Sequence, residues 1–270
     1  MQNIAIKEQI VKNVVKSGNG GAVWVPKKWL GQEVVVILPD KPKVDIKEKI
    51  IHLLEPYLKD AVAVFMYGSY ARHEETEESD VDVMVVTKDK AIQLGIEESN
   101  LEITAFQLDK LKKAIEKHPV VYYQIVQEAE PLVNSYVLDE LKGIKVSSEN
   151  FKSYIAETEE HIESNKELIE LDKLDSKYVK SYSVLYSAML RLRGIFIIKC
   201  ILNKDKFSNK EFREWLGKWI SNREFEQCYF AYKAIKMNKS INLKIEISVA
   251  EKLLGILQKE TVSMIAELYG

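Results

Sequence analysis

The spacing of apolar residues changes twice along the chain of 270 residues. In the middle part, short apolar runs of strand length alternate with stripes of helical spacing, which is typical of an α/β arrangement. This pattern predicts strands at residues 61–67, 81–86 and 101–105, and helices at 46–54 and 108–117. Residues 120–126 are apolar and β-branched, so that run is compatible with either a strand or a helix.

The C-terminal part has a helical pattern throughout. From residue 151 onward the spacing predicts one amphipathic helix at 151–169 and a long, largely buried one at 178–202. Ser208, Ser221 and Ser248 are each followed three residues later by a glutamate, which is the capping-box spacing of a helix start. These features predict a bundle of about four or five helices.

The first 44 residues contain short β-rich runs at 11–15, 22–25 and 33–38. A glycine-rich turn at 17–21 separates the first two runs, and Pro26 begins a predicted single helical turn. The whole pattern predicts an α+β, multidomain fold. Its three parts are a small β-rich N-terminal module (1–44), a mixed-sheet α/β domain (45–148) and a C-terminal helical bundle (149–270).

The formal net charge of −2 conceals an uneven distribution. Residues 1–44 carry seven lysines and three acids, a net of +4, whereas residues 45–150 carry 12 basic and 21 acidic residues, a net of −9. Residues 151–270 carry 20 basic and 17 acidic residues, a net of +3. This distribution is consistent with three segments of different function.

Composition excludes several classes of protein. The hydrophobic fraction of 46% excludes wholesale disorder, and two cysteines exclude a disulfide framework. The longest apolar stretch, residues 185–202, contains three basic residues, so no membrane span is expected. Residues 1–9 lack the basic and then apolar pattern of a secretory signal, so we expect a reduced, cytoplasmic location.

Asp80 and Asp82 are the first candidates for chemistry. They stand two residues apart at the start of a predicted strand, where period-two geometry directs both carboxylates to the same side of the sheet. Two close carboxylates repel each other, so they require a compensating cation. Proteins hold Mg²⁺ with one or two carboxylates plus substrate phosphates. The alternative is that both residues are solvent-exposed strand or turn positions.

Gly68 and Ser69 follow the preceding predicted strand. A glycine permits a tight turn and close backbone approach, and N–H groups at a helix start hold phosphates. Arg72, one turn further, would add a charge contact, so these three residues are the candidate nucleotide-binding set. The alternatives are a plain turn and a surface arginine. The acidic stretch 74–78 is expected to be a solvated loop.

The pattern Gly68-Ser69, ten intervening residues and Asp80-Val81-Asp82 resembles the signature of the DNA polymerase beta-type nucleotidyltransferase superfamily. Its minimal and kanamycin nucleotidyltransferase-like members are the most similar in appearance. The resemblance covers residues 46–145 and implies that Asp80 and Asp82 are catalytic, metal-binding carboxylates. It also implies a third such carboxylate at Glu102, where many minimal members carry Asp.

The resemblance implies an enzyme that moves a nucleoside monophosphate, with AMP the expected group, from an NTP to an unidentified acceptor. Pyrophosphate is the other product, and Mg²⁺ or Mn²⁺ is the implied cofactor. The acceptor is a protein, an RNA or a small molecule.

Residues 14–38 resemble swapped-hairpin sequences of the AbrB/MazE type, which implies an intertwined homodimer that binds DNA. A segment of this length buries little core alone, so dimerisation or docking is expected, with Trp24 and Trp29 as core residues. Alternatively, the module only packs or dimerises, and its lysines are ordinary solvated residues. The basic surface for DNA phosphates would consist of Lys12, Lys16, Lys27 and Lys28.

The helical tail more loosely resembles the helical domains of kanamycin nucleotidyltransferase-like enzymes and HEPN-type bundles. A HEPN ribonuclease requires an arginine followed four to six residues later by histidine, and no histidine follows Arg191 or Arg193 in this way. A ribonuclease is therefore not expected. The competing hypothesis for the chain is a DNA-binding or antitoxin-like regulator that uses the nucleotidyltransferase fold as a scaffold or nucleotide sensor.

Overall fold

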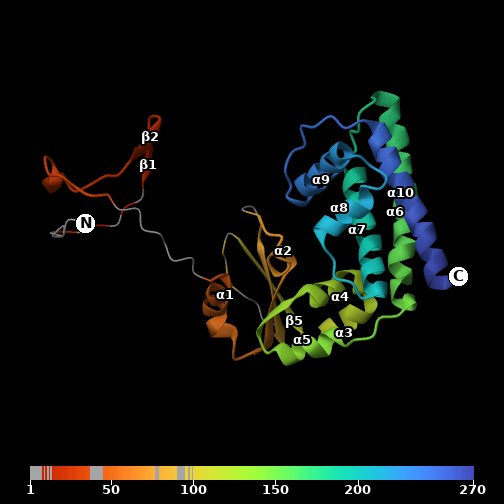
Figure 1. Ribbon diagram of the computed structural model, residues 1–270, viewed down its shortest axis with the longest axis horizontal. Helices are drawn as coiled ribbons and strands as arrows, with labels where there is room; N and C mark the ends of the chain where they lie inside the picture. The colour runs from red at the N-terminus through yellow and green to blue at the C-terminus, as the bar shows by residue number, and fades with distance from the viewer. Residues whose placement is uncertain are drawn as a thin grey trace. The chain divides into compact units, whose positions relative to one another are not determined.

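The computed structural model describes residues 8, 10, 12, 14–36, 45–76, 79–89, 95, 96, 98 and 100–270. The chain divides into two units, Met1–Val44 and Asp45–Gly270, and each is considered separately. Their helices and strands are labelled in Figure 1. The predicted α+β class is confirmed, because a mixed sheet and many helices make up the second unit.

The described part of the N-terminal unit is one small hairpin and one helical turn. Strand β1 (Val15–Ser17) pairs antiparallel with β2 (Gly20–Ala22), and the 3-10 helix η1 (Lys27–Trp29) confirms the predicted helical turn. No described residue of this unit is buried in the single chain, and Trp24 is 74% exposed, so the predicted core role of Trp24 and Trp29 stays a prediction for a dimer or docked form.

Two further strands predicted for this unit differ from the structure. Residues 33–36 form no strand, and residues 37 and 38 lie outside the described residues. The predicted strand at 11–15 begins only at Val15, while residues 11 and 13 are not described. A strand requires a neighbouring strand to pair with its N–H and C=O groups. Among the described residues of this unit, only β1 and β2 pair in this way.

A four-stranded mixed sheet with the order β5-β4-β3-β6 lies at the centre of the second unit. The β4–β5 pair is parallel, whereas β3 is antiparallel to both β4 and β6. The three predicted strands are confirmed, while the short β6, which contains Pro131, is absent from the predictions. The strands are β3 (Ala61–Tyr67), β4 (Val81–Thr87), β5 (Leu101–Gln107) and β6 (Glu130–Val133).

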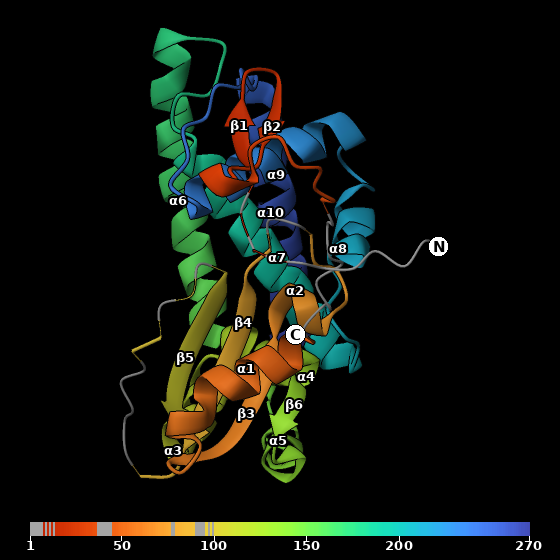
Figure 2. The ribbon, with the colours of Figure 1, turned by 90° about the vertical axis from the view of Figure 1, so that its left-hand side faces the viewer.

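Helices cover both faces of this sheet. Helix α1 (Ile46–Leu54) crosses one face (Figure 2), where it packs on alternate residues of β4 such as Val83. The other face carries Phe65 and Met84 and is covered by α3 (Leu108–Lys117), α4 (Pro119–Glu128) and α5 (Ser135–Lys142). Burial on both faces explains why the β3 and β4 sequences are continuous apolar runs.

The local signals for these helices are clear in two places. Asp45 is the N-cap of α1, and its side chain accepts a hydrogen bond from the Lys47 backbone N–H, which is the usual role of an aspartate at this position. The ambiguous run at 120–126 is part of α4, which begins with Pro119 in the first turn, where a missing N–H is tolerated.

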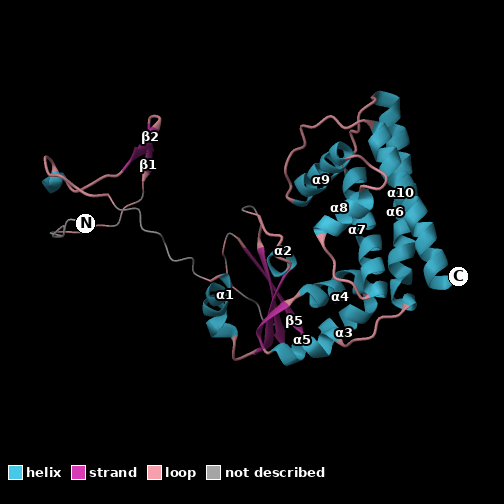
Figure 3. Cartoon of the chain, in the orientation of Figure 1, coloured by secondary structure: helices cyan, strands magenta, loops and turns pink. Residues whose placement is uncertain are grey.

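The C-terminal part is a bundle around one apolar core (Figure 3), as predicted. The predicted start of the long helix at residue 178 is wrong, because Asp172 holds the chain in a loop by accepting hydrogen bonds from the Lys180 and Ser181 backbone N–H groups. The helices are α6 (Lys152–Asp175), α7 (Ser183–Asn203), α8 (Asn209–Leu216), α9 (Asn222–Lys236) and α10 (Ile247–Tyr269).

Two of the three predicted helix caps are confirmed. Ser221 and Glu224 form a complete capping box, and the Ser208 side chain accepts from backbone N–H groups at the start of α8. Ser248 is not a cap, because α10 already begins at Ile247. In the described parts of the chain, no helix combines the length and apolarity that a membrane span requires.

Gly194 of α7 provides a test of the helix packing, because a Cβ on this residue would overlap the ring of Tyr154 in α6. We expect Gly194→Ala to lower the free energy of unfolding by about 1–3 kcal/mol, since a ring must move inside a packed interface. Urea denaturation of the full chain measures the change.

Gly255→Ala in α10 is the matched control. A Cβ there meets no atom within 4 Å, so the gain in helix propensity should raise the free energy of unfolding by about 0.5–1 kcal/mol. Equal effects of the two substitutions would contradict the packing described for Gly194.

Candidate active site

Three polar side chains lie next to one another across the sheet, at the edge where β3 ends and β4 begins. Asp82 of β4 is paired with Tyr67 of β3 on one side and with Glu102 of β5 on the other. Residues paired across neighbouring strands point to the same face. This is the face that α3, α4 and α5 cover, because Phe65 and Met84, two residues along their strands, belong to that core.

The three predicted carboxylates occupy different positions at this edge. Asp82 is half-buried within β4, and Glu102 is exposed on β5 beside it. Asp80 is exposed and lies just before β4 begins at Val81. The structure therefore brings Asp82 and Glu102 side by side and places Asp80 at the entrance of the same strand.

Gly68 lies directly against the Asp82 carboxylate. Its φ of +75° is in the left-handed region that favours glycine, and a Cβ at this position would overlap Oδ2 of Asp82. Gly68 begins the short helix α2 (Gly68–Ala71) immediately after β3. Both the turn and the close approach to Asp82 therefore require a glycine here.

The electrostatics of Asp82 reflect its surroundings. Burial raises the pKa of the Asp82 carboxyl to about 6, and the negative charges of Glu102, Glu128 and Asp80 add to this rise. The positive charge of Lys236, the last residue of α9, acts in the opposite direction. The site is thus an acidic cluster with one nearby cation contributed by the helical bundle.

A divalent cation fits the chemistry of this donor set. Carboxylate oxygens are the ligands that Mg²⁺ prefers, and the burial that raises the Asp82 pKa disfavours its charged form, which a bound cation would stabilise. Within the described residues, no group of three or more histidines, cysteines or acids is arranged to hold a metal. A cation at this edge would therefore need ligands beyond the carboxylates as they are placed here, such as substrate phosphates.

The predicted nucleotide-binding residues lie beside this pair, but two of them have protein partners. The Gly68 backbone N–H donates to Oε1 of Glu128 at 2.9 Å, and Arg72 Nη1 donates to Oε2 of Glu128 at 2.7 Å. Arg72 Nε also donates to Glu74 at 2.9 Å, and only 11% of the Arg72 side chain is exposed. Ser69 is half-buried, so its hydroxyl is the member of the set most accessible to a phosphate.

Glu128 and Lys236 are the site residues that sequence reasoning missed. Glu128 ends an apolar helix 60 residues after Gly68, and only 7% of its side chain is exposed. The available signal was an acid at the end of an apolar run, since such an acid needs a partner when buried. Lys236 gives no comparable signal, because lysines are common near helix ends.

The acidic stretch after Arg72 is only partly a solvated loop. Glu74 is hydrogen-bonded to Ser208 and Asn209 of the bundle, contrary to the expectation, whereas Glu75 is exposed as predicted. Glu77 and Glu78 lie outside the described residues. The partners of Glu74 come from more than 130 residues away, so no local pattern indicates them.

The lysines expected to contact DNA are all exposed, as both alternatives for the N-terminal unit require. Lys28 forms an ion pair with Glu8, with 2.7 Å between Nζ and Oε1. The others are Lys12, Lys16 and Lys27.

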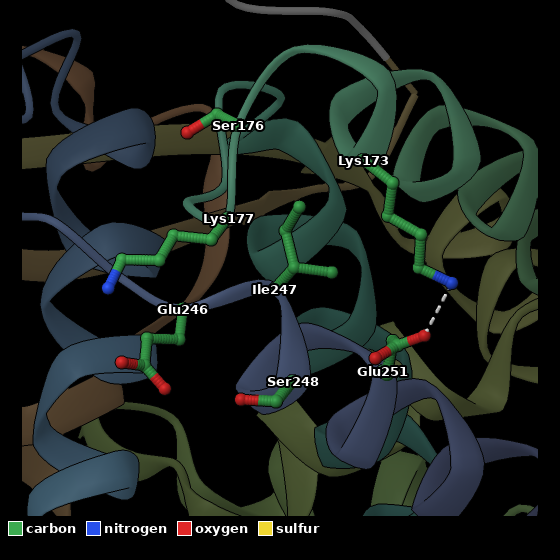
Figure 4. Close-up of a pocket in the computed structure, with 7 residues that line it drawn as sticks. All are labelled: Lys173, Ser176, Lys177, Glu246, Ile247, Ser248 and Glu251. Carbon is green, nitrogen blue, oxygen red and sulfur yellow. Dashed lines mark ion pairs between the residues drawn. The ribbon is translucent and has the colours of Figure 1, made fainter.

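A separate hollow of about 440 Å³ opens where α6 ends and α10 begins (Figure 4). One side is crossed by an ion pair between Lys173 and Glu251, 2.7 Å apart. None of the predicted site residues lines it. The lining residues are Lys173, Ser176, Lys177, Glu246, Ile247, Ser248 and Glu251.

Residues 48–136 match the family described as "Polymerase beta, Nucleotidyltransferase". A search of curated proteins gave no match.

Two solved structures are similar to the chain at 12% sequence identity. One is spectinomycin adenyltransferase AAD(9) from Enterococcus faecialis with ATP and spectinomycin, where the match covers 79% of this chain and 97% of that one with a TM-score of 0.45. The other is a nucleotidyltransferase-like protein from Exiguobacterium sibiricum 255-15, where it covers 82% and 76% with a TM-score of 0.37. Similarities at this level carry no argument about substrate.

The raised pKa of Asp82 predicts that this residue destabilises the folded chain at neutral pH. Above pH 6 the Asp82 carboxyl is ionised in both states, but its charge is unfavourable only in the folded state, where the pKa is about 6 instead of the ordinary 3.8. We expect Asp82→Asn to raise the free energy of unfolding by about 1 kcal/mol at pH 7.5, after allowing for solvent screening. Urea denaturation measures this change.

The pH dependence makes this test specific. The gain should fall by more than half between pH 7.5 and pH 4.5, because the Asp82 carboxyl of the folded chain is then protonated and uncharged. Glu159→Gln, at an exposed position of α6, is the control and should show no such dependence. A gain independent of pH would contradict the electrostatic account.

Proposed function

We propose that the chain transfers a nucleoside monophosphate, AMP, from an NTP to an acceptor hydroxyl, because residues 48–136 match the polymerase beta nucleotidyltransferase family. Pyrophosphate is the leaving group. The observation that carries the proposal is the Asp82–Glu102 pair on neighbouring strands, with Gly68 packed against Asp82.

Each carboxylate has a role that follows from its exposure. Asp82, half-buried and short of compensating charge, would hold a divalent cation, Mg²⁺ or Mn²⁺, with Asp80 and Glu102 completing the site. When bound, that cation neutralises the triphosphate and activates the attacking oxygen. Glu102 is exposed at the sheet edge, so it is the carboxylate best placed to meet the acceptor hydroxyl.

The turn after β3 and the bundle would handle the phosphates. The Ser69 hydroxyl and the backbone of the turn would contact phosphate oxygens, while Arg72 would act indirectly because its guanidinium already binds Glu74 and Glu128. Lys236 lies near enough for its charge to act on Asp82 and would attract the triphosphate. The acceptor is a protein, an RNA or a small molecule.

The competing proposal, a DNA-binding regulator, rests on the exposed lysines of the N-terminal unit, Lys12, Lys16, Lys27 and Lys28. Exposure is equally expected of ordinary solvated lysines, so this proposal has weaker support than nucleotidyl transfer. An intertwined homodimer would belong to the same proposal, because it would cover the apolar residues of that unit, such as Val36, which is 72% exposed.

The transfer reaction can be tested with ATP labelled at the α-phosphate, Mg²⁺, and three acceptor pools: total RNA, cell protein and spectinomycin. We expect label to enter one pool, with Asp82→Asn and Glu102→Gln lowering the rate more than about 100-fold, since even groups that merely orient metal ligands are worth about 10- to 100-fold. Asp60→Asn, an exposed acid in a turn, should leave the rate unchanged.

Transfer that survives both site substitutions would refute the catalytic assignment. Absence of nucleotide turnover, combined with DNA binding that weakens steeply with salt, would favour the regulator instead.

The close contact at Gly68 predicts a second, acceptor-independent effect. Gly68→Ala should weaken binding of Mn²⁺ with a non-hydrolysable ATP analogue by about tenfold or more, because the new Cβ displaces the Asp82 carboxylate. Electron paramagnetic resonance of Mn²⁺ measures this binding.

Gly31→Ala is the matched control for backbone strain. Gly31 has a φ of +76°, nearly that of Gly68, but a Cβ there meets no atom within 4 Å. Equal binding by the two variants would show that contact with Asp82 is not important for the site.

A further inference from the structure

Glu74 lies in the loop after α2, yet its carboxylate caps the start of α8 in the helical bundle. Oε1 accepts hydrogen bonds from the Ser208 hydroxyl and the Asn209 backbone N–H, both at 2.9 Å. Oε2 accepts one from the Asn209 side-chain amide at 2.8 Å. A carboxylate is stabilised at a helix N-terminus by unpaired N–H groups and the helix dipole, so Glu74 ties this loop to the bundle.

The guanidinium of Arg72 connects this cap to a second carboxylate. Its Nε donates to Oε2 of Glu74 at 2.9 Å, and its Nη1 donates to Oε2 of Glu128 at 2.7 Å. The ring centroid of Phe207, in the bundle core, lies 5.6 Å from the guanidinium carbon. Because the guanidinium is a rigid fork, it fixes the position of one carboxylate relative to the other.

The second carboxylate reaches the candidate active site. Oε1 of Glu128 accepts the Gly68 backbone N–H at 2.9 Å, and Gly68 lies directly against Asp82. Hydrogen bonds therefore run without a break from the start of α8, through Glu74, Arg72 and Glu128, to the residue that packs on Asp82.

The members of this path are protected from solvent. The exposed fractions of the Glu128, Arg72 and Glu74 side chains are 7%, 11% and 21%. Burial alone would raise the pKa of Glu74. The hydrogen bonds from Arg72, Ser208 and Asn209 together have the larger, opposite effect, so the pKa lies below its ordinary value. Removing one partner from a buried pair leaves an uncompensated charge. A change at one member of the path should therefore displace the others as well.

We propose that Glu74 is a positioning residue through which the helical bundle fixes the Gly68 turn against Asp82. This inference rests on the proposed nucleotidyl transfer, because a fixed turn is what holds the phosphates in line with the acceptor. Glu74 acts through Arg72 and Glu128 and does not itself meet the reacting groups. A shift of α8 would thereby reach the active site.

The test uses the full chain with Glu74→Gln, Asn209→Ala and the double variant. The first readout is the NMR chemical shift of the Gly68 amide proton, which reports its hydrogen bond to Glu128 and requires no activity. We expect both single substitutions to move this resonance in the same direction. The double variant should move it by less than the sum, because both changes interrupt one path.

The second readout is kinetic. We expect kcat for transfer from Mg·ATP to fall about 10- to 100-fold, the range for groups that orient direct ligands, and KM for ATP to rise because the same turn holds the phosphates. Asn150→Ala is the control, because it removes a 2.8 Å hydrogen bond to the Glu116 carbonyl that also joins the helical part to the catalytic domain, together with the local capping box with Ser147. It should leave the Gly68 resonance and kcat as they are.

A Gly68 resonance that does not move in Glu74→Gln, or a loss of kcat equal to that of Asn150→Ala, would overturn the inference. Wild-type chain that transfers nothing would contradict the proposed function instead, and the Gly68 resonance would still decide whether the path from α8 exists.

Discussion

The charge of the half-buried Asp82 carboxylate governs the arrangement of residues around it. Gly68 must lack a side chain because it lies against that carboxylate. A further acid, Glu128, is accommodated nearby since Arg72 and the Gly68 N–H both donate to it. At Asp82, burial and the charges of Glu102, Glu128 and Asp80 outweigh the opposing charge of Lys236, and a divalent cation would offset this imbalance.

The helical bundle is part of the candidate site rather than a separate attachment. It supplies Lys236, whose charge acts on Asp82, and the start of α8, which holds Glu74. Buried polar contacts lose much of their stabilisation when one partner is displaced, so they specify geometry more strictly than an apolar contact does. The geometry at the sheet edge therefore depends on residues more than 130 positions away.

The sequence predicts those features that have a local physical cause. The continuous apolar runs of β3 and β4 follow from burial on both faces of the sheet, and the spacing of Asp80 and Asp82 places an acid where β4 begins. In both cases, neighbours along the chain carry the signal. Glu102 is implied by the family resemblance instead, and the pairing of β5 with β4 places it beside Asp82.

Features with a long-range cause could not be predicted in this way. Glu128 reaches Gly68 only when α4 folds back over the sheet, and Glu74 has its partners in α8. The capping spacing at Ser248 predicts the wrong helix start, because α10 begins one residue earlier. In the N-terminal unit, apolar runs predict strands and a core, but the described residues bury none of their side chains.

The central claim is that the charge at Asp82 is what a cation neutralises. Calorimetric titration of Mn²⁺ into the full chain at pH 6, in two buffers of different ionisation enthalpy, counts the protons released on binding. With an Asp82 pKa of about 6, the account predicts release of about half a proton per Mn²⁺ by the wild-type chain and none by Asp82→Asn. Release that is absent from the wild type, or unchanged in Asp82→Asn, would contradict it.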